Sequence, residues 1–387
     1  MIEKYYSGVI EQIYNRIGKE TRNIVMANYS NDFSIENLEV IRRYQSNEDN
    51  VFFAYSEFSY NTLVGAYEPF LDIICNMHRR FIGGSFDDFQ KECGVYYLHR
   101  QVLNSYYETG ECFREETVLL NEVAYEQRRM TMAIADMLKK LSEVKPLMIV
   151  INRFQMASKS SIETIKYLID NPCANIGIVL GVNAIVKGTD STVEVWDRIV
   201  ESLEDRSAIY YIGSAGPLKN NVKTTNDDEL YITMNFEQSI QEASNIMEFL
   251  DFEQARRGCR IIEHKLKFED AWIDEKSLRR FYMVYARTSV LLGEMSKAIE
   301  LTNEYKALIP ENDSEHYLSL YYFMKGTCYM YQGKLEKAGN SAKSAYDYAV
   351  LAEDDTLIFK AELLSVMIKM SGWYNIFFCV QDIPVSD

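Results

Sequence analysis

The histidines and cysteines are the first residues to consider for chemistry, because they ligate metals and act in nucleophilic catalysis. The chain has only four histidines, and none is paired with another at metal-ligand spacing. The seven cysteines are scattered, odd in number and form no CxxC pair. The sequence therefore indicates neither a zinc site nor a disulfide framework, and it favours a reducing compartment such as the cytoplasm.

The charge balance limits the classes of partner. Among 387 residues, 41 are Lys or Arg and 57 are Asp or Glu, which gives a net charge of −16. Such acidity opposes non-specific binding to nucleic acid or to an anionic membrane. The longest apolar runs are far shorter than the ~20 residues of a membrane span. We therefore expect no nucleic-acid and no membrane partner for this chain.

The pattern of apolar residues changes near residue 235. Before it, short apolar runs typical of strands buried on both faces alternate with helical patterns. The runs are 22–28, 50–55, 148–152, 176–181 and 208–213, and the helical patterns are 34–44, 67–81, 116–141 and 161–169. Strands that alternate with helices predict a parallel sheet covered by helices. We thus predict an α/β domain over residues 1–235 and an all-α domain over residues 236–387.

The helical sequence after residue 235 contains an internal repeat. GEMSKA at 293–298 matches GKLEKA at 333–338, and GWYNIF at 372–377 follows thirty-nine residues later. A small residue stands seven positions before each glycine, and two copies carry an alanine five positions after it. These signature residues are Ala286, Gly293, Ala298, Gly326, Gly333, Ala338, Ser365 and Gly372. The small residue allows close helix approach and the glycine ends the first helix of a pair, so the spacing resembles the tetratricopeptide repeat. An earlier copy, with Ala243, Ala255 and Leu250 at the glycine place, is weaker.

Residues 146–158, PLMIVINRFQMAS, resemble the Walker B strand of STAND-type AAA ATPases, which are signal-transduction ATPases. Gln155 and Ala157 match that motif, and the following helical pattern and strand agree with it in order. Residues 55–70 resemble the second strand of this family and its Tyr-x-Pro-Phe segment. The resemblance spans about residues 5–185 and implies a P-loop-type fold.

The chain departs from this family where nucleotide chemistry is done. Asn152 and Arg153 stand in place of the acidic pair, although Mg²⁺ requires charged oxygen ligands. The loop after the first strand, 28–37, has neither glycine nor lysine, so it lacks the groups that hold phosphate. We therefore predict a degenerate P-loop domain without ATPase activity, cofactor or metal, whose vestigial cleft holds Tyr29, Asn31, Asn152 and Arg153.

The resemblance implies a non-catalytic regulator or scaffold in signal transduction or transcriptional control, which binds a protein or peptide through its repeats. Two alternatives stay open. One is a diverged signalling ATPase that uses Lys187 or Lys219, and the other is a small-ligand sensor in the vacated cleft. The repeat pattern also looks cut short after residue 381, so further repeats or a DNA-binding segment could follow. The sequence does not indicate the oligomeric state or the partner.

Overall fold

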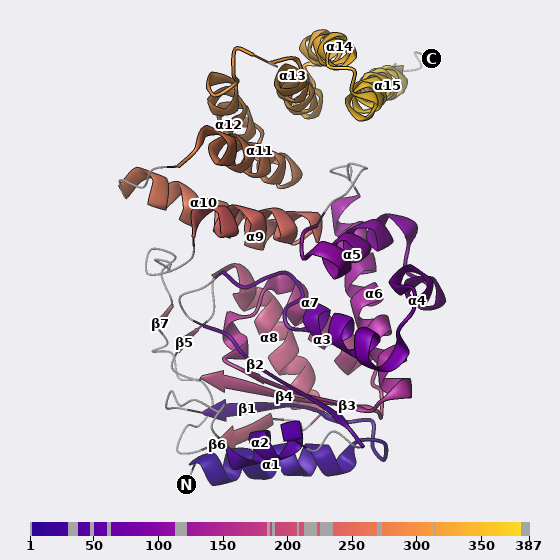
Figure 1. Ribbon diagram of the computed structural model, residues 1–387, viewed down its shortest axis with the longest axis vertical. Helices are drawn as coiled ribbons and strands as arrows, with labels where there is room; N and C mark the ends of the chain where they lie inside the picture. Colours follow the sequence, from indigo (N-terminus) through magenta and orange to yellow (C-terminus); the bar gives the residue numbers. More distant parts are fainter. Residues whose placement is uncertain are drawn as a thin grey trace, which may run out of the picture. The chain divides into compact units, whose positions relative to one another are not determined.

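The structure is a computed structural model, and it describes most of the chain in two compact units, Met1–Phe268 and Glu269–Asp387 (Figure 1). The described residues are 2–29, 38–46, 50–59, 63–112, 122–183, 186–187, 190–206, 209–212, 223–224, 235–268, 273–312 and 314–380. None of the helices within these ranges combines the length and the apolar composition that a membrane span needs.

A parallel five-stranded sheet forms the centre of the first unit. Its order is β2 (Phe52–Glu57), β3 (Leu147–Asn152), β4 (Ile176–Asn183), β1 (Ile24–Tyr29) and β6 (Ile209–Ile212). Every residue of β3 and β4 is buried, which explains their continuous apolar sequences. Each of the five predicted runs overlaps one of these strands. The predicted parallel α/β fold is therefore confirmed, with the 2-3-4-1-5 strand order of a P-loop-like domain.

Helices cover both faces of this sheet (Figure 1). On one face lie α1 (Ile2–Arg16), which packs on β1, β4 and β6, and α2 (Glu39–Ser46), which packs on β2. On the other face lie α3 (Phe70–Met77), α6 (Val123–Val144), α7 (Lys159–Asp170) and α8 (Asp190–Asp205). Two very short strands, β5 (Val186–Lys187) and β7 (Lys223–Thr224), form a separate two-stranded sheet.

Local sequence explains where α7 begins and which side it buries. The hydroxyl of Ser158 accepts the backbone N–H of Ser161, as an N-cap does. Ile162, Ile165 and Leu168 are buried on one face of the helix. This is the predicted helix over 161–169. The predicted helix over 67–81 is instead α3 followed by a π-helical turn, His78–Ile82, and two further helices follow, α4 (Phe86–Glu92) and α5 (Tyr97–Thr109).

A helical hairpin, α9 (Phe236–Glu248) and α10 (Phe252–Phe268), belongs to the first unit. Residues of the hairpin make hydrogen bonds that reach across the unit: Asn245 Oδ1 accepts from Cys112 N (2.9 Å), Asp251 Oδ2 accepts from Ser160 N (2.9 Å), and Gln254 Nε2 donates to Val64 O (2.9 Å). The predicted domain boundary, between residues 235 and 236, falls where this hairpin begins. The compact unit continues to Phe268, because these bonds tie the hairpin to the α/β domain.

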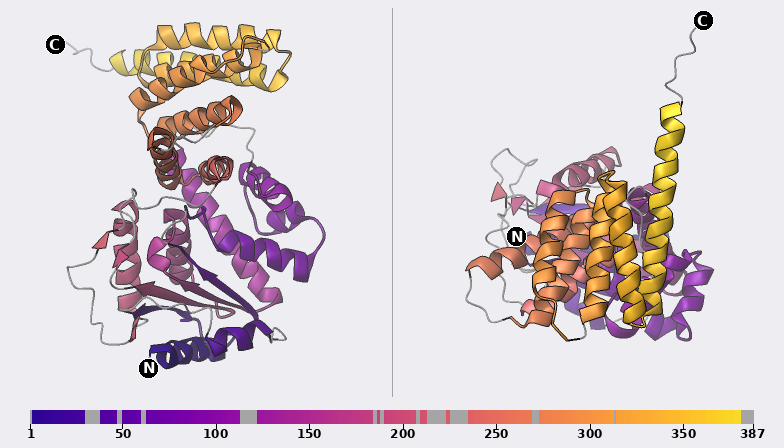
Figure 2. Two further views of the ribbon diagram at one scale, coloured as in Figure 1. Left: turned by 60° about the vertical axis from the view of Figure 1, so that its left-hand side comes forward. Right: turned by 90° about the horizontal axis from the view of Figure 1, so that it is seen from above.

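The second unit is all helical. It contains α11 (Glu275–Leu291), α12 (Met295–Ala307), α13 (Ser314–Tyr331), α14 (Leu335–Leu351) and α15 (Asp355–Val380). Consecutive helices pack on one another, and α13 also contacts α15. Figure 2 shows these helices side by side, with α15 at one edge of the layer. The predicted all-α region of packed helix pairs is therefore confirmed.

The turns within the helix pairs share one backbone conformation. Gly293 and Gly333 have φ values of +78° and +73°, in the left-handed region that glycine adopts without steric cost. After each glycine, a backbone N–H reaches back to the preceding helix, from Glu294 to Ser289 O (2.8 Å) and from Lys334 to Tyr329 O (2.9 Å). This is the Schellman arrangement that ends helices. Leu250, at the glycine place of the α9–α10 hairpin, has φ +68° in the same turn.

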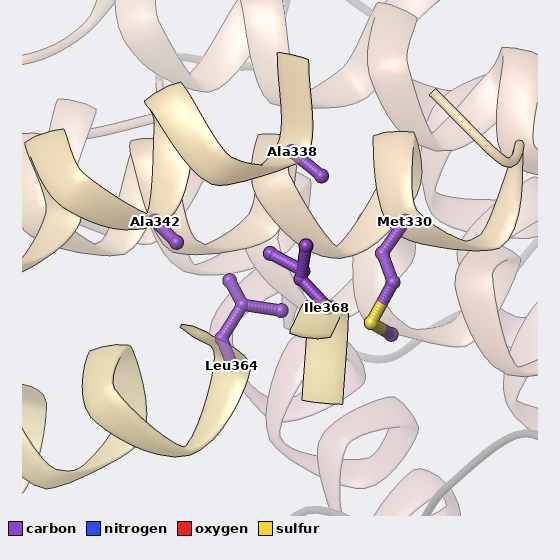
Figure 3. Packing of buried hydrophobic residues seen from close by; sticks show 5 residues of the cluster. All are labelled: Met330, Ala338, Ala342, Leu364 and Ile368. Carbon is purple, nitrogen blue, oxygen red and sulfur yellow. The ribbon is translucent and has the colours of Figure 1, made fainter. Parts of the chain in front are cut away.

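Small residues set the spacing of the helices in the second unit. A Cβ atom on Gly326 would lie 3.0 Å from Leu364 Cδ2 and 3.4 Å from Ala338 O, so α13 approaches both neighbouring helices closely there. Figure 3 shows the buried cluster at this junction, which comprises Met330, Ala338, Ala342, Leu364 and Ile368. The packing therefore combines small residues of α13 and α14, such as Gly326 and Ala338, with bulky residues of α13 and α15, such as Met330 and Leu364.

The predicted turn at Gly372 is not formed. Helix α15 continues through this position to Val380. A lone glycine costs a helix only about 1 kcal/mol relative to alanine, which does not by itself end the helix. Residues 373–380 contain no proline that would remove a backbone donor.

Candidate functional site

The carboxyl edge of the sheet is the place where a P-loop-like domain would hold a ligand. Four strands end there in register, since Glu57 pairs with Asn152 across β2 and β3, and Tyr29 pairs with Asn183 across β1 and β4. Their side chains come from distant parts of the chain. The sheet order, rather than any local motif, brings them to one edge.

Tyr29 and Asn152 bond to each other at this edge. The Tyr29 hydroxyl donates to Oδ1 of Asn152 at 2.6 Å, and neither residue has any exposed surface. The Asn152 amide oxygen at the end of β3 is therefore already used as an acceptor. Asn152 is also neutral, so it brings no charge with which to hold a hard cation.

Arg153 is likewise engaged within the chain. Its backbone has φ +54°, and its guanidinium lies 3.0 Å from the carboxylate of Glu57 at the end of β2. The guanidinium also donates to Phe58 O at 3.4 Å. The side chains of Arg153 and Glu57 are about four-fifths covered, with 21% and 18% exposed. An acid in the place of Arg153 would instead face the Glu57 carboxylate.

Tyr6 of α1 completes the closure of this edge. A Cβ atom on Gly181 would lie 2.3 Å from the Tyr6 hydroxyl oxygen and 2.9 Å from Asn152 Oδ1, so only glycine leaves room for these two groups over β4. Burial, followed by the nearby Tyr29, Tyr55 and Glu57, raises the pKa of Tyr6, which therefore stays neutral. Gln155 contributes too, because its Oε1 accepts the backbone N–H of Asn183 at 3.2 Å.

Of the four residues predicted for the cleft, the structure brings together Tyr29, Asn152 and Arg153. Asn31 lies outside the described residues, as does Lys219. Lys187 is in the short strand β5, which pairs with β7 and not with the main sheet. Sequence reasoning missed Tyr6 and Glu57. The only signal for Glu57 is that it lies two residues after a predicted strand, and Tyr6 could be placed only once α1 was known to pack on β4.

The repeat residues lie where helices meet. Ala286, Ala298 and Ala338 have at most 1% of their surface exposed. Ser365 is partly buried, and its hydroxyl donates to Ala361 O within the same helix. These positions therefore have a packing environment rather than a chemical one.

A small acidic cleft separates α9 from the segment before α3. It measures about 230 Å³ and is lined by Glu68, Asp72, Glu242 and Tyr106 among others. Glu68 accepts the backbone N–H of Gly65 (2.8 Å), and Tyr106 donates to Asp72 (3.0 Å). Burial, then repulsion from Glu68 and Asp72, raises the pKa of Glu242 to about 7. Among the described side chains, no group of three or more potential ligands is arranged to hold a metal ion.

A larger cleft of about 530 Å³ runs along α6 and α7. Arg128, Lys159 and Lys166 line it, but Glu163 and Asp170 lie between them. Because both signs of charge alternate along its wall, the cleft has no field of one sign with which to select a ligand.

Comparison with known proteins adds no family to this picture. No protein-family model matches the chain, and no curated protein sequence matches it significantly. The interpretation therefore depends on the strand order, the contacts at the carboxyl edge and the paired helices.

Proposed function

We propose that the chain is a non-catalytic regulatory or scaffold protein, in which a degenerate domain resembling STAND-type AAA ATPases is joined to tetratricopeptide-like repeats that bind a protein or peptide. The observation that carries the proposal is the closed carboxyl edge. The Tyr29–Asn152 hydrogen bond and the Arg153–Glu57 ion pair occupy the positions where a hydrolase needs a carboxylate for Mg²⁺ and another to prepare water.

Isothermal titration of the full chain with ATP and Mg²⁺ tests the nucleotide half of the proposal. We expect no Mg²⁺-dependent heat of binding. The double variant Asn152→Asp, Arg153→Asp serves as a comparison, because it restores both acids without restoring a phosphate-binding loop; it should bind no better. A Mg²⁺-dependent dissociation constant for ATP tighter than ~100 μM, or phosphate release above background, would overturn this half.

Peptide panning on the full chain tests the other half. The repeat region packs aromatic side chains on α13 and α14, including the stacked rings of Tyr322 and Tyr348, 5.6 Å apart. Aromatic side chains are frequent anchors in interfaces. Enriched peptides whose affinity falls on Tyr322→Ala but not on Tyr125→Ala, an exposed tyrosine of α6, would support partner binding by the repeats. Peptides that bind both variants equally well would contradict it.

Ligand sensing at the same edge is a second candidate. One observation favours it: Nδ2 of Asn152 is buried and has no hydrogen-bond partner among the described residues. A small ligand with a carbonyl or carboxylate oxygen could accept from this amide. A panel of carboxylate metabolites screened by thermal shift would favour this candidate if a stabilising compound lost its effect on Asn152→Leu.

A further inference from the structure

Helix α15 has two apolar faces. One is buried within the chain: Leu357, Ala361, Leu364 and Ile368 are at most 8% exposed. The other is open to solvent and is called here the outer stripe: Phe359, Leu363, Val366 and Met370, with 59%, 39%, 50% and 57% of their surface exposed. A helix that is apolar on opposite sides is ordinarily covered on both. The outer stripe is therefore an exposed apolar face that the described residues leave uncovered.

The equivalent face of the preceding repeat shows what such a surface requires. In the sequence alone, the thirty-nine-residue offset between Gly333 and Gly372 aligns Leu363 and Val366 with Met324 and Thr327 of α13, although no turn forms at Gly372. Those two residues are only 4% and 9% exposed, in a helix that packs against α12, α14 and α15. The same face in α13 is thus closed by helices, so a helix is the fitting occupant for the outer stripe.

The spacing of the outer stripe also specifies helix-to-helix packing. Its residues follow one another at intervals of four, three and four, which is the a/d pattern of a coiled-coil seam. Trp373 and Phe377 continue the same intervals in the sequence. An isolated patch for a small ligand would not need this period over nineteen residues.

Charges beside the stripe indicate which helix fits. Glu362 and Lys369 are both exposed and flank the seam seven residues apart, each one position before a stripe residue. If two copies of α15 pair antiparallel, with Leu363 of one facing Val366 of the other, Phe359 faces Met370. The same register places Glu362 of each copy beside Lys369 of the other. A parallel pair would instead bring like positions together and lose both contacts.

We propose that the outer stripe of α15 is a homodimer interface, in which two copies of this chain pair their α15 helices antiparallel. The interface combines an apolar seam, which supplies affinity, with two symmetric ion pairs, which fix orientation and register.

Sedimentation equilibrium of the full chain tests this proposal. We expect a monomer–dimer equilibrium for the natural sequence. Val366→Asp should weaken it at least ~100-fold, because each dimer would then bury two unpaired carboxylates. Val366 is half exposed in the single chain, so the variant should keep its far-ultraviolet circular dichroism. A natural chain that stays monomeric at every concentration, or a Val366→Asp dimer of unchanged affinity, would overturn the proposal.

Charge exchange distinguishes the antiparallel pair from any other use of the stripe. Glu362→Lys and Lys369→Glu should each weaken the dimer, since each change places like charges at positions 362 and 369 in both contacts between the two copies. The double variant should restore affinity close to that of the natural chain, with the signs reversed. Lys343→Glu, an exposed charge change on α14, is the matched control and should leave the dimer unaffected. A double variant no stronger than the single ones would contradict the antiparallel register.

Discussion

The sheet edge of the first unit and the helix junctions of the second keep their architecture by different means. In the sheet, backbone pairing and buried apolar strands fix the fold, so the residues at the strand ends can change their chemistry without loss of the scaffold. In the helical unit, the contact residues themselves set the spacing, as Gly326 and Ala338 do. A parallel sheet can therefore tolerate substitutions at its strand ends, whereas paired helices depend on the residues at their contacts.

The two sides of α15 should give the largest contrast in stability. Leu364→Ala should cost about 3 kcal/mol, because it opens a cavity in the cluster of Figure 3. Its neighbour Leu363 lies on the outer stripe, and Leu363→Ala should change stability by no more than about 0.5 kcal/mol. Urea unfolding followed by circular dichroism, at a concentration where the chain is monomeric, measures both. Equal losses would mean that the two faces are not distinct.

Close packing at the carboxyl edge predicts the next largest effect. Gly181→Ala should destabilise the first unit by about 2 kcal/mol, since the new methyl group would collide with the Tyr6 hydroxyl and Asn152. Gly8→Ala is the control, because nothing lies within 4 Å of a Cβ atom there; in a helix it should stabilise by up to ~1 kcal/mol. The unfolding temperatures of the two variants should shift in opposite directions from that of the natural chain. Tolerance of alanine at 181 would contradict a closed edge.

Much of this architecture could be predicted from the sequence, and the physical reason differs between elements. Strands such as Leu147–Asn152 are buried on both faces, so their continuous apolar sequences predict them. The regular spacing of Gly293 and Gly333 likewise predicts the turns within the helix pairs. The close contact of Tyr6 with Gly181 could not be predicted, because it joins α1 to β4 across 175 positions and depends on the sheet order. Similarly, Gly372 has the right spacing, yet spacing alone does not break a helix.

The acidic cleft predicts a pH dependence. The Glu242 carboxyl has a pKa of about 7 in the folded chain against an ordinary 4.5, so the folded state binds more protons between these values. This contribution to stability is fully present below pH 4.5 and is lost as the pH rises through 7. In the natural chain, partial exposure limits the resulting decline in the free energy of unfolding between pH 4.5 and 7 to about 1–2 kcal/mol. The Glu242→Gln variant should not show this decline. Parallel stability–pH curves for the two proteins would contradict the cluster.

The helix-ending turns should give the smallest effects. Gly333→Ala should cost about 1 kcal/mol, because alanine is strained at φ +73°. Glu353 adopts φ +51° at the turn after α14, and Glu353→Gly should stabilise by about 0.5 kcal/mol for the same reason. Chemical unfolding of the helical unit measures both signs. A stabilising Gly333→Ala would mean that this turn is not the one described.

The most direct test of the central claim is an experimental structure of the full chain determined after incubation with Mg²⁺ and a non-hydrolysable ATP analogue. The account predicts that Tyr29 remains bonded to Asn152, that Arg153 remains paired with Glu57, and that no phosphate lies at the carboxyl edge of the sheet. A nucleotide bound there, with the Asn152 oxygen turned toward Mg²⁺, would contradict it.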